Sequence, residues 1–397
     1  MSLAAETPAA KTTWLVLVAI SLCHMINDIM QSLLAAIYPL LALEFDLSFW
    51  QIGLMTFAFQ VTASLLQPLV GLVTDRKPLP QSLPIGMGST LVGLLLLAFA
   101  QSYGGLLVGA MLIGIGSAVF HPESSRVARL ASGGKFGTAQ SLFQVGGNFG
   151  SALGPLLAAF IVVPLGRPSV AAFAVMAMIG MVILNRVGLW YGNLARASAA
   201  KGRPAVTHGL SRNRVIWAIV VLAVLTFSKN AYTASVTSYY TFFLIDRFDL
   251  GIEAAQQMLF LFLAATAAGV MLGGLIGDRF GPIVVIWGSI VGVLPFTLML
   301  PHVGLVATGA LSVVIGLIIA SAFPAIVVYA QNLMPGRIGL VAGIFFGFAF
   351  GMGGIAAAIL GLLADARGIA WVYQVCAFLP LLGLLTIFLP TRQRLAS

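Results

Sequence analysis

Polar side chains that could do chemistry stand inside long apolar stretches of this chain. His24, Asp28 and Gln31 recur at spacings of four and three, so they share one face of a helix, with Asn27 beside them. A carboxylate in an apolar segment is costly unless it is paired or hydrated, and such acids usually line a pathway. The stripe therefore predicts that Asp28 takes up and releases a proton beside His24. A static His24–Asp28 hydrogen bond that only fixes packing is the alternative.

A second polar group follows about a hundred residues later, where His121 and Glu123 flank Pro122 and Arg126 comes one turn on. We expect His121 and Glu123 to take part in proton handling, and Arg126 to help bind an anionic substrate. The alternative is that Glu123 only pairs with Arg126. A helical zinc site typically has two histidines four residues apart. That spacing is missing here, so no metal is predicted.

Lys229 is the corresponding feature of the second half, and Thr233 and Tyr240 lie on its face at helical spacing. An ammonium group in apolar surroundings needs a carboxylate or an anionic ligand. Lys229 is therefore predicted to bind an anion, and a permanent Lys229–Asp28 salt bridge remains the alternative. Side-chain amides on other apolar stretches could hydrogen-bond the same substrate without a charge. These candidates are Asn27, Gln31, Gln60, Gln67, Gln144 and Asn148.

The composition places these residues in a membrane. Hydrophobic residues make up 60% of the chain and charged residues 8%, against about a quarter charged in soluble domains. A helix needs about 20 apolar residues to cross a bilayer, and solid apolar runs exclude the alternating pattern of a β-barrel. The sequence predicts an all-α membrane protein with twelve spans, at 14–42, 50–73, 83–100, 105–130, 138–163, 170–192, 214–244, 254–277, 282–300, 305–332, 340–364 and 370–390.

The placement of the charges explains the net charge of +9 without a nucleic-acid partner. Most basic residues fall at the ends and turns that share a side with the N-terminus, whereas Arg167, Arg247 and Arg367 fall on the other side. Cytoplasmic segments of membrane proteins are enriched in Lys and Arg. Both termini are therefore predicted to be cytoplasmic.

An internal repeat relates the two halves. The segment Gly71-Leu-Val-Thr-Asp75-Arg76 returns as Gly274-Leu-Ile-Gly-Asp278-Arg279, a shift of 203 residues (278 − 75). Repeats in corresponding topological positions are typical of transporters. We expect six-helix bundles at 1–192 and 214–397, joined by a cytoplasmic linker at 193–213. Glycines spaced by four, at 146, 150 and 154 and at 343, 347 and 351, predict faces where helices pack closely.

Twelve spans in two halves with a doubled Gly-x-x-x-Asp-Arg motif resemble the major facilitator superfamily. The resemblance implies that the loop acids and bases latch the outward-open state, a role that falls here on Asp75, Arg76, Asp278 and Arg279. The first copy departs from the family pattern where it continues as Lys77-Pro78.

The runs 119–129 and 139–150, with 21–28, closely resemble the fosmidomycin resistance protein family of bacterial efflux carriers. That resemblance implies proton-driven export of fosmidomycin, a small phosphonate, by rocker-switch alternating access in the bacterial inner membrane. It also implies that no cofactor is needed and that the carrier works as a monomer among membrane lipids.

Two alternatives remain from the residues. A proton-coupled importer of an organic anion or phosphorylated metabolite would use the same residue types on the same fold. A membrane-embedded enzyme is not predicted, because no nucleophile, base and orienting group recur at a suitable spacing.

Overall fold

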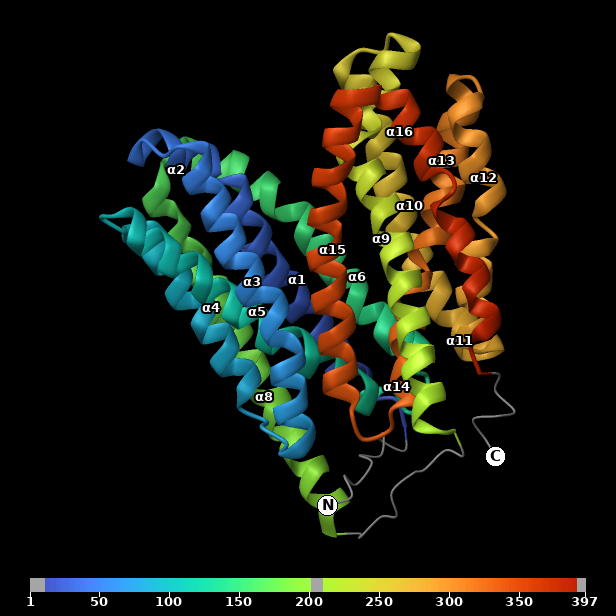
Figure 1. Cartoon of the computed structure of the whole chain (residues 1–397). Helices are drawn as coiled ribbons and strands as arrows, with labels where there is room; N and C mark the ends of the chain where they lie inside the picture. The colour runs from blue at the N-terminus through green and yellow to red at the C-terminus, as the bar shows by residue number, and fades with distance from the viewer. Residues whose placement is uncertain (1–10, 201–209, 391–397) are drawn as a thin grey trace. The chain divides into compact units, whose positions relative to one another are not determined.

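The computed structural model of the protein describes residues 11–200 and 210–390, and every regular element within them is a helix (Figure 1). These residues include twelve helices long and apolar enough to cross a membrane, which confirms the predicted fold class and number of spans. The chain divides into two compact units, which we call unit 1 (residues 1–206 and 335–347) and unit 2 (residues 207–334 and 348–397). The predicted bundle limits and linker stay predictions, and residues 201–209 of that linker lie outside the described residues.

Unit 1 contains the first six spans. Its α-helices are α1 (Trp14–Ala36), α2 (Tyr38–Phe45), α3 (Phe49–Arg76), α4 (Ser82–Phe99), α5 (Tyr103–Ala131), α6 (Phe136–Leu157), α7 (Val163–Leu165) and α8 (Phe173–Ala200). A π-helical turn, Ala158–Val162, joins α6 to α7, and a 3-10 turn, Arg167–Ala172, leads into α8. The predicted linker therefore begins within a helix, since α8 continues to Ala200.

Local sequence explains where several of these helices begin and end. The first predicted span extended to residue 42, but α1 ends at Ala36 and α2 starts anew with Pro39 in its first turn. Proline is tolerated there because the first N–H groups of a helix have no partner within the helix. Ser48 begins α3 through a capping box with Gln51, in which each side chain bonds the other residue's backbone N–H.

Close helix contacts form the core of unit 1. Along α6, an added Cβ at Gly146 would overlap the Ser21 backbone of α1, and one at Gly150 would overlap Met25. The first half of the predicted glycine pattern is therefore a packing face. At one end of the unit, the N–H of Thr13 donates to the carbonyl of Ala131 at 2.8 Å, which holds the start of α1 against the end of α5.

Unit 2 contains the remaining spans. Its α-helices are α9 (Arg212–Phe248), α10 (Ile252–Phe280), α11 (Pro282–Ile286), α12 (Leu294–Met299), α13 (Leu305–Ala320), α14 (Ala322–Leu333), α15 (Ile338–Arg367) and α16 (Ile369–Cys376). Further turns are π-helical at Trp287–Val291 and 3-10 at Leu300–His302 and Leu379–Phe388. The tenth predicted span is divided at Ser321, between α13 and α14. Helix α15 is shared, because its residues 338–347 belong to unit 1.

Candidate functional site

A buried cluster of two histidines and one aspartate lies inside unit 1. His24 and Asp28 are one turn apart on α1, and His121 reaches them from α5. The Nε2 atoms of His24 and His121 are 3.3 Å apart, and they lie 3.5 and 3.7 Å from the Asp28 carboxylate oxygens. Asp28 is 6% exposed, and the two histidines are more deeply buried. We call these three residues the proton cluster.

Three further side chains hold the Asp28 carboxylate as a hydrogen-bond acceptor. Asn27 Nδ2 and Gln31 Nε2 donate to its Oδ1 at 3.1 and 3.0 Å. Ser151 Oγ on α6 donates to Oδ2 at 3.4 Å. Donors aimed at a carboxylate favour its charged form, whereas burial opposes it. The carboxylate is thus placed where a change in its surroundings alters its proton occupancy.

The hydrogen-bond partners of the two histidine rings are compatible with one additional proton on His121. His24 Nδ1 lies 2.7 Å from the Phe143 carbonyl, and His121 Nδ1 lies 3.0 Å from the Ser117 carbonyl. Carbonyl oxygens only accept, so neutral rings that satisfy both contacts turn two Nε2 lone pairs toward each other. With the His121 proton on Nε2 instead, that nitrogen can donate to His24 Nε2, and the Ser117 hydroxyl, 3.3 Å from His121 Nδ1, can donate to Nδ1. A second proton on His121 lets both of its nitrogens donate, Nδ1 to the Ser117 carbonyl and Nε2 toward His24.

Helix α6 closes over the proton cluster through a glycine. A Cβ added at Gly147 would lie 2.9 Å from Asp28 Oδ2 and closer still to the His24 ring. On the same helix, Phe143 stacks on His24 with ring centroids 4.0 Å apart. Phe346, in the part of α15 that belongs to unit 1, lies 5.2 Å from the His121 ring. The aromatic rings and the backbone at Gly147 enclose the cluster, which limits its contact with water.

A second buried network lies farther along α5 and contains Asp75, one of the four residues of the predicted latch. Arg126 is 1% exposed and forms an ion pair with Asp75, while its Nη2 lies 3.5 Å from Glu123 Oε1. Its Nη1 donates to the Thr74 carbonyl at 2.6 Å and to the Tyr191 hydroxyl at 3.1 Å. A buried charge is tolerated only when it is paired and hydrogen-bonded, and Arg126 meets both conditions.

The Asp75 carboxylate also caps the start of α15. Its two oxygens accept the N–H groups of Gly339 at 2.9 Å and of Leu340 at 2.8 Å. These are free donors of a helix N-terminus, where the helix dipole also favours a negative charge. The motif glycine makes the approach possible, because a Cβ at Gly71 would overlap the Gly339 backbone. We call Asp75, Arg126 and the N-terminus of α15 the latch.

The other motif residues have different surroundings. Arg76 is exposed at the end of α3. In unit 2, Asp278 is half-buried near the end of α10, and the guanidinium of Arg279 lies 5.2 Å from the Phe280 ring centroid. The two motif aspartates thus belong to different units, Asp75 to unit 1 and Asp278 to unit 2.

The predicted amides lie on three helices of unit 1. Gln67 of α3 is fully buried, with Nε2 bonded to the Ala63 carbonyl at 2.7 Å, and Gln60 lies two turns earlier on α3. On α6, Gln144 donates to Asn148 at 3.4 Å. Within the described residues, the side-chain oxygens of Asn27, Gln67 and Gln144 are buried without a hydrogen-bond donor. Such acceptors are costly in an apolar interior, so they suit a ligand or water that donates to them.

Lys229 lies near the middle of α9 in unit 2. Its ammonium is 5.6 Å from the Phe323 ring centroid of α14 and 3.3 Å from Asn230 Oδ1. The hydroxyl of Thr233 bonds back to the Lys229 carbonyl at 2.9 Å. Tyr240 is fully buried in the core of unit 2, with its hydroxyl 3.4 Å from the Thr308 carbonyl. Both the predicted anion binding by Lys229 and the alternative, a permanent Lys229–Asp28 salt bridge, stay untested; the two residues belong to different units.

The proton cluster is also the group of described residues best placed to share an ion, since its donor atoms all lie within 4.8 Å of one another. Two imidazoles and a carboxylate suit a divalent transition metal as well as a proton. The sequence predicted no metal, and that prediction stays untested.

Sequence reasoning missed several partners that the fold supplies. It grouped His24 with Asp28 but placed His121 in a separate group, although the two histidines are in contact. It assigned Arg126 to the substrate, whereas the structure places its guanidinium on Asp75. The glycine signals at Gly147 and Gly339 were present in the sequence, but what each glycine faces depends on long-range packing.

Comparisons with known proteins agree with this architecture. Residues 20–358 match the model of the Major Facilitator Superfamily. The chain is 58% identical to the fosmidomycin resistance protein of Escherichia coli (strain K12), over 98% of this chain and 96% of that protein. It is 40% identical to the uncharacterised MFS-type transporter YfnC of Bacillus subtilis (strain 168), over 97% and 95%. Among solved structures, FucP in the outward conformation covers 96% of this chain and 100% of its own, with a TM-score of 0.71 and 16% identity.

Proposed function

Because the chain belongs to the major facilitator superfamily, we propose that it exports fosmidomycin or related small anionic or amphipathic compounds in exchange for protons. The proposed location is the inner membrane of a bacterium, and the proposed working form is a monomer. A relative named for fosmidomycin resistance, matched over 98% of this chain, supports the cargo. The superfamily consists of transporters, so the chain is not an enzyme.

The proton cluster carries the proposal of proton coupling. One more proton on His121 lets both of its nitrogens donate, Nδ1 to the Ser117 carbonyl and Nε2 toward His24 Nε2. Asp28, within 3.7 Å of both rings, supplies the balancing charge. The helices packed around the cluster add little charge of their own. Helix α6 and residues 338–347 of α15 contain no charged residue. On α5, Glu123 and Arg126 pair with each other farther along, and Arg129 lies in its last turn against the Phe136 ring.

Export then follows from competition between protons and an anion. Lys229 is the proposed anion-binding residue, helped by Thr233, Tyr240 and Arg126, and the amides Asn27, Gln31, Gln60, Gln67, Gln144 and Asn148 are proposed to hydrogen-bond the cargo. Proton uptake at Asp28 weakens the hydrogen bonds that its carboxylate accepts and resets the carrier. Glu123 is proposed to receive or pass the proton on the latch side of α5, where it faces Arg126.

The latch is proposed to set the conformation. Asp75 joins α3 and α5 to the start of α15, so breaking this contact frees α15 from unit 1. In the proposed cycle it holds the outward-open state, and Arg76, Asp278 and Arg279 assist at the same side of the membrane. The two halves then rock to alternate access.

Proton flux triggered by fosmidomycin tests the function. Purified protein is placed in liposomes of defined orientation with an internal pH dye, and wild type is compared with Asp28→Asn. The control Asp46→Asn makes the same chemical change at an exposed residue whose backbone φ of 51° is one that asparagine adopts readily. We expect proton movement opposite to the drug in wild type and control, and none in Asp28→Asn.

Two other results would change the conclusion. Proton and drug moving in the same direction would identify the importer instead, on the same fold and with the same cluster. Full pH-driven transport by Asp28→Asn would remove the proton cluster from the coupling path.

A further inference from the structure

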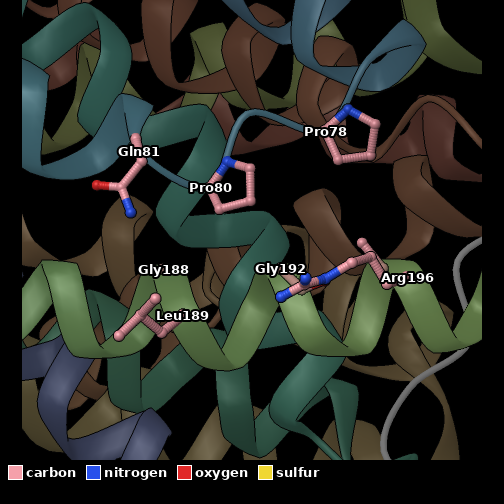
Figure 2. Close-up of a pocket in the computed structure, with 8 residues that line it drawn as sticks. Pro78, Pro80, Gln81, Gly188, Leu189, Gly192 and Arg196 are labelled. Carbon is pink, nitrogen blue, oxygen red and sulfur yellow. The ribbon is translucent and has the colours of Figure 1, made fainter.

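A pocket of about 470 Å³ lies at one end of unit 1, between the loop that follows α3 and the last turns of α8. Pro78, Pro80 and Gln81 form its loop side (Figure 2). On α8, Gly188 and Gly192 leave the helix surface bare, and Arg196 lies at the end of the pocket. The pocket therefore combines apolar walls with a guanidinium at its rim.

An apolar groove continues along the same helix. It has a volume of about 390 Å³ and is lined by Val175, Met178, Ile179, Val182 and Ile183 of α8. Val175, Val182, Leu189 and Arg196 are spaced by seven, so they lie on nearly one face of the helix. Val182 is 65% exposed and Leu189 is 50% exposed. Pocket and groove are thus two parts of one path along α8.

The charges on this path are all positive. Arg186 follows Val182 by one turn on the same face, and Lys77 directly precedes the loop wall of the pocket. Both are exposed, as is Arg196. Arg196 uses Nε and Nη2 for bonds to the Gly192 carbonyl and the Asn193 side chain. These bonds fold the guanidinium back along α8 toward Gly192 (Figure 2).

The dimensions match one leaflet of a bilayer. The 14 residues from Val182 to Arg196 (196 − 182) span about 21 Å at about 1.5 Å per residue. Half of a bilayer, headgroups included, is about 20–22 Å thick. A phospholipid whose headgroup lies in the pocket would therefore extend an acyl chain past Leu189 to the Val182 end of the groove.

We propose that unit 1 binds one anionic phospholipid, with its phosphate at Arg196 and an acyl chain along the α8 groove. Charge complementarity selects an anionic headgroup over a zwitterionic one. The pocket's loop wall begins two residues after Arg76, so bound lipid also supports the loop that follows the latch aspartate. This site is independent of the proposed transport activity.

Native mass spectrometry of the purified transporter tests the site. Wild type is compared with Arg196→Gln and with Gly192→Leu, which fills the pocket but keeps the charge; a Cβ at position 192 already lies 3.3 Å from Pro80. The control Arg212→Gln removes one exposed basic residue from the start of α9. The probes are phosphatidylglycerol and phosphatidylcholine, and the thermal unfolding temperature of each variant verifies folding.

We expect one tightly held phosphatidylglycerol in wild type and in Arg212→Gln, preferred over phosphatidylcholine. Arg196→Gln should weaken phosphatidylglycerol binding about fivefold, the effect of one basic residue at an anionic surface. Gly192→Leu should weaken both lipids. If Arg196→Gln weakens phosphatidylglycerol binding but Gly192→Leu does not, the lipid is attracted only by surface charge, and the pocket is not a binding site. Equal binding by all four proteins would also overturn the proposal.

Discussion

Asp75→Asn should release the start of α15 from unit 1 while leaving the protein folded. The amide keeps one oxygen acceptor but loses the second, so either the Gly339 or the Leu340 N–H is left without its partner. Hydrogen bonds to a charged group contribute about 1.5–3 kcal/mol each. Arg126 also loses one of its two acidic partners, although Glu123 remains 3.5 Å away. We therefore expect a loss of about 3 kcal/mol, or about a hundredfold in the latched-to-unlatched ratio.

Pulsed electron paramagnetic resonance between spin labels measures this shift. The labels are placed at Lys135 and Arg212, which are exposed residues of the two different units. The natural cysteines Cys23 and Cys376 are buried and should not take up label. Asp75→Asn should add a new, longer distance population, whereas the control Asp46→Asn should give the wild-type distribution. An unchanged distribution in a folded Asp75→Asn protein would refute the latch, because the electrostatic loss would then have no conformational consequence.

Two further substitutions probe the proposed sites. Gly147→Ala should abolish proton coupling and lower the unfolding temperature, because the new Cβ would lie 2.9 Å from Asp28; Gly53→Ala, whose Cβ meets nothing within 4 Å, should leave both unchanged. Lys229→Met should weaken binding of a phosphonate at least tenfold but spare neutral amphipathic cargo, as measured by equilibrium binding. Unchanged phosphonate affinity would remove Lys229 from the site.

Helical periodicity was enough to predict one side of the proton cluster. The spacing of His24, Asp28 and Gln31 places them on one face whatever the rest of the chain does, and Gln31 does donate to Asp28. The twelve spans followed from composition in the same local way. His121 was different, because its contact with His24 joins residues 97 positions apart. Only the packing of α5 against α1 brings them together. The spacing of polar residues within either helix does not indicate which other helix it contacts.

The contacts of the latch were also not predictable from the sequence, because they join residues far apart in the chain. The doubled Gly-x-x-x-Asp-Arg motif indicated that Asp75 and Asp278 mattered, but not what they touch. Asp75 caps α15 through Gly339, which lies 264 residues later, so no local capping signal such as a nearby serine could reveal the contact. Arg126 was predicted to help bind an anionic substrate, and that role stays a prediction. The sequence did not indicate its ion pair with Asp75, an aspartate on another helix.

Helix α5 joins the two polar networks, and this gives the proposed proton coupling a mechanical route. His121 in the proton cluster and Arg126 in the latch are five residues apart, about 7.5 Å along the axis. Both side chains are buried and held by named partners, so a movement of one requires a movement of the shared backbone. In the proposed cycle, loss of the extra proton leaves His121 with one N–H donor, so its hydrogen bonds with His24 and Ser117 rearrange. The resulting shift of α5 moves Arg126, which lies on the same helix. The ion pair between Arg126 and Asp75 then changes, and with it the hydrogen bonds from Asp75 to α15.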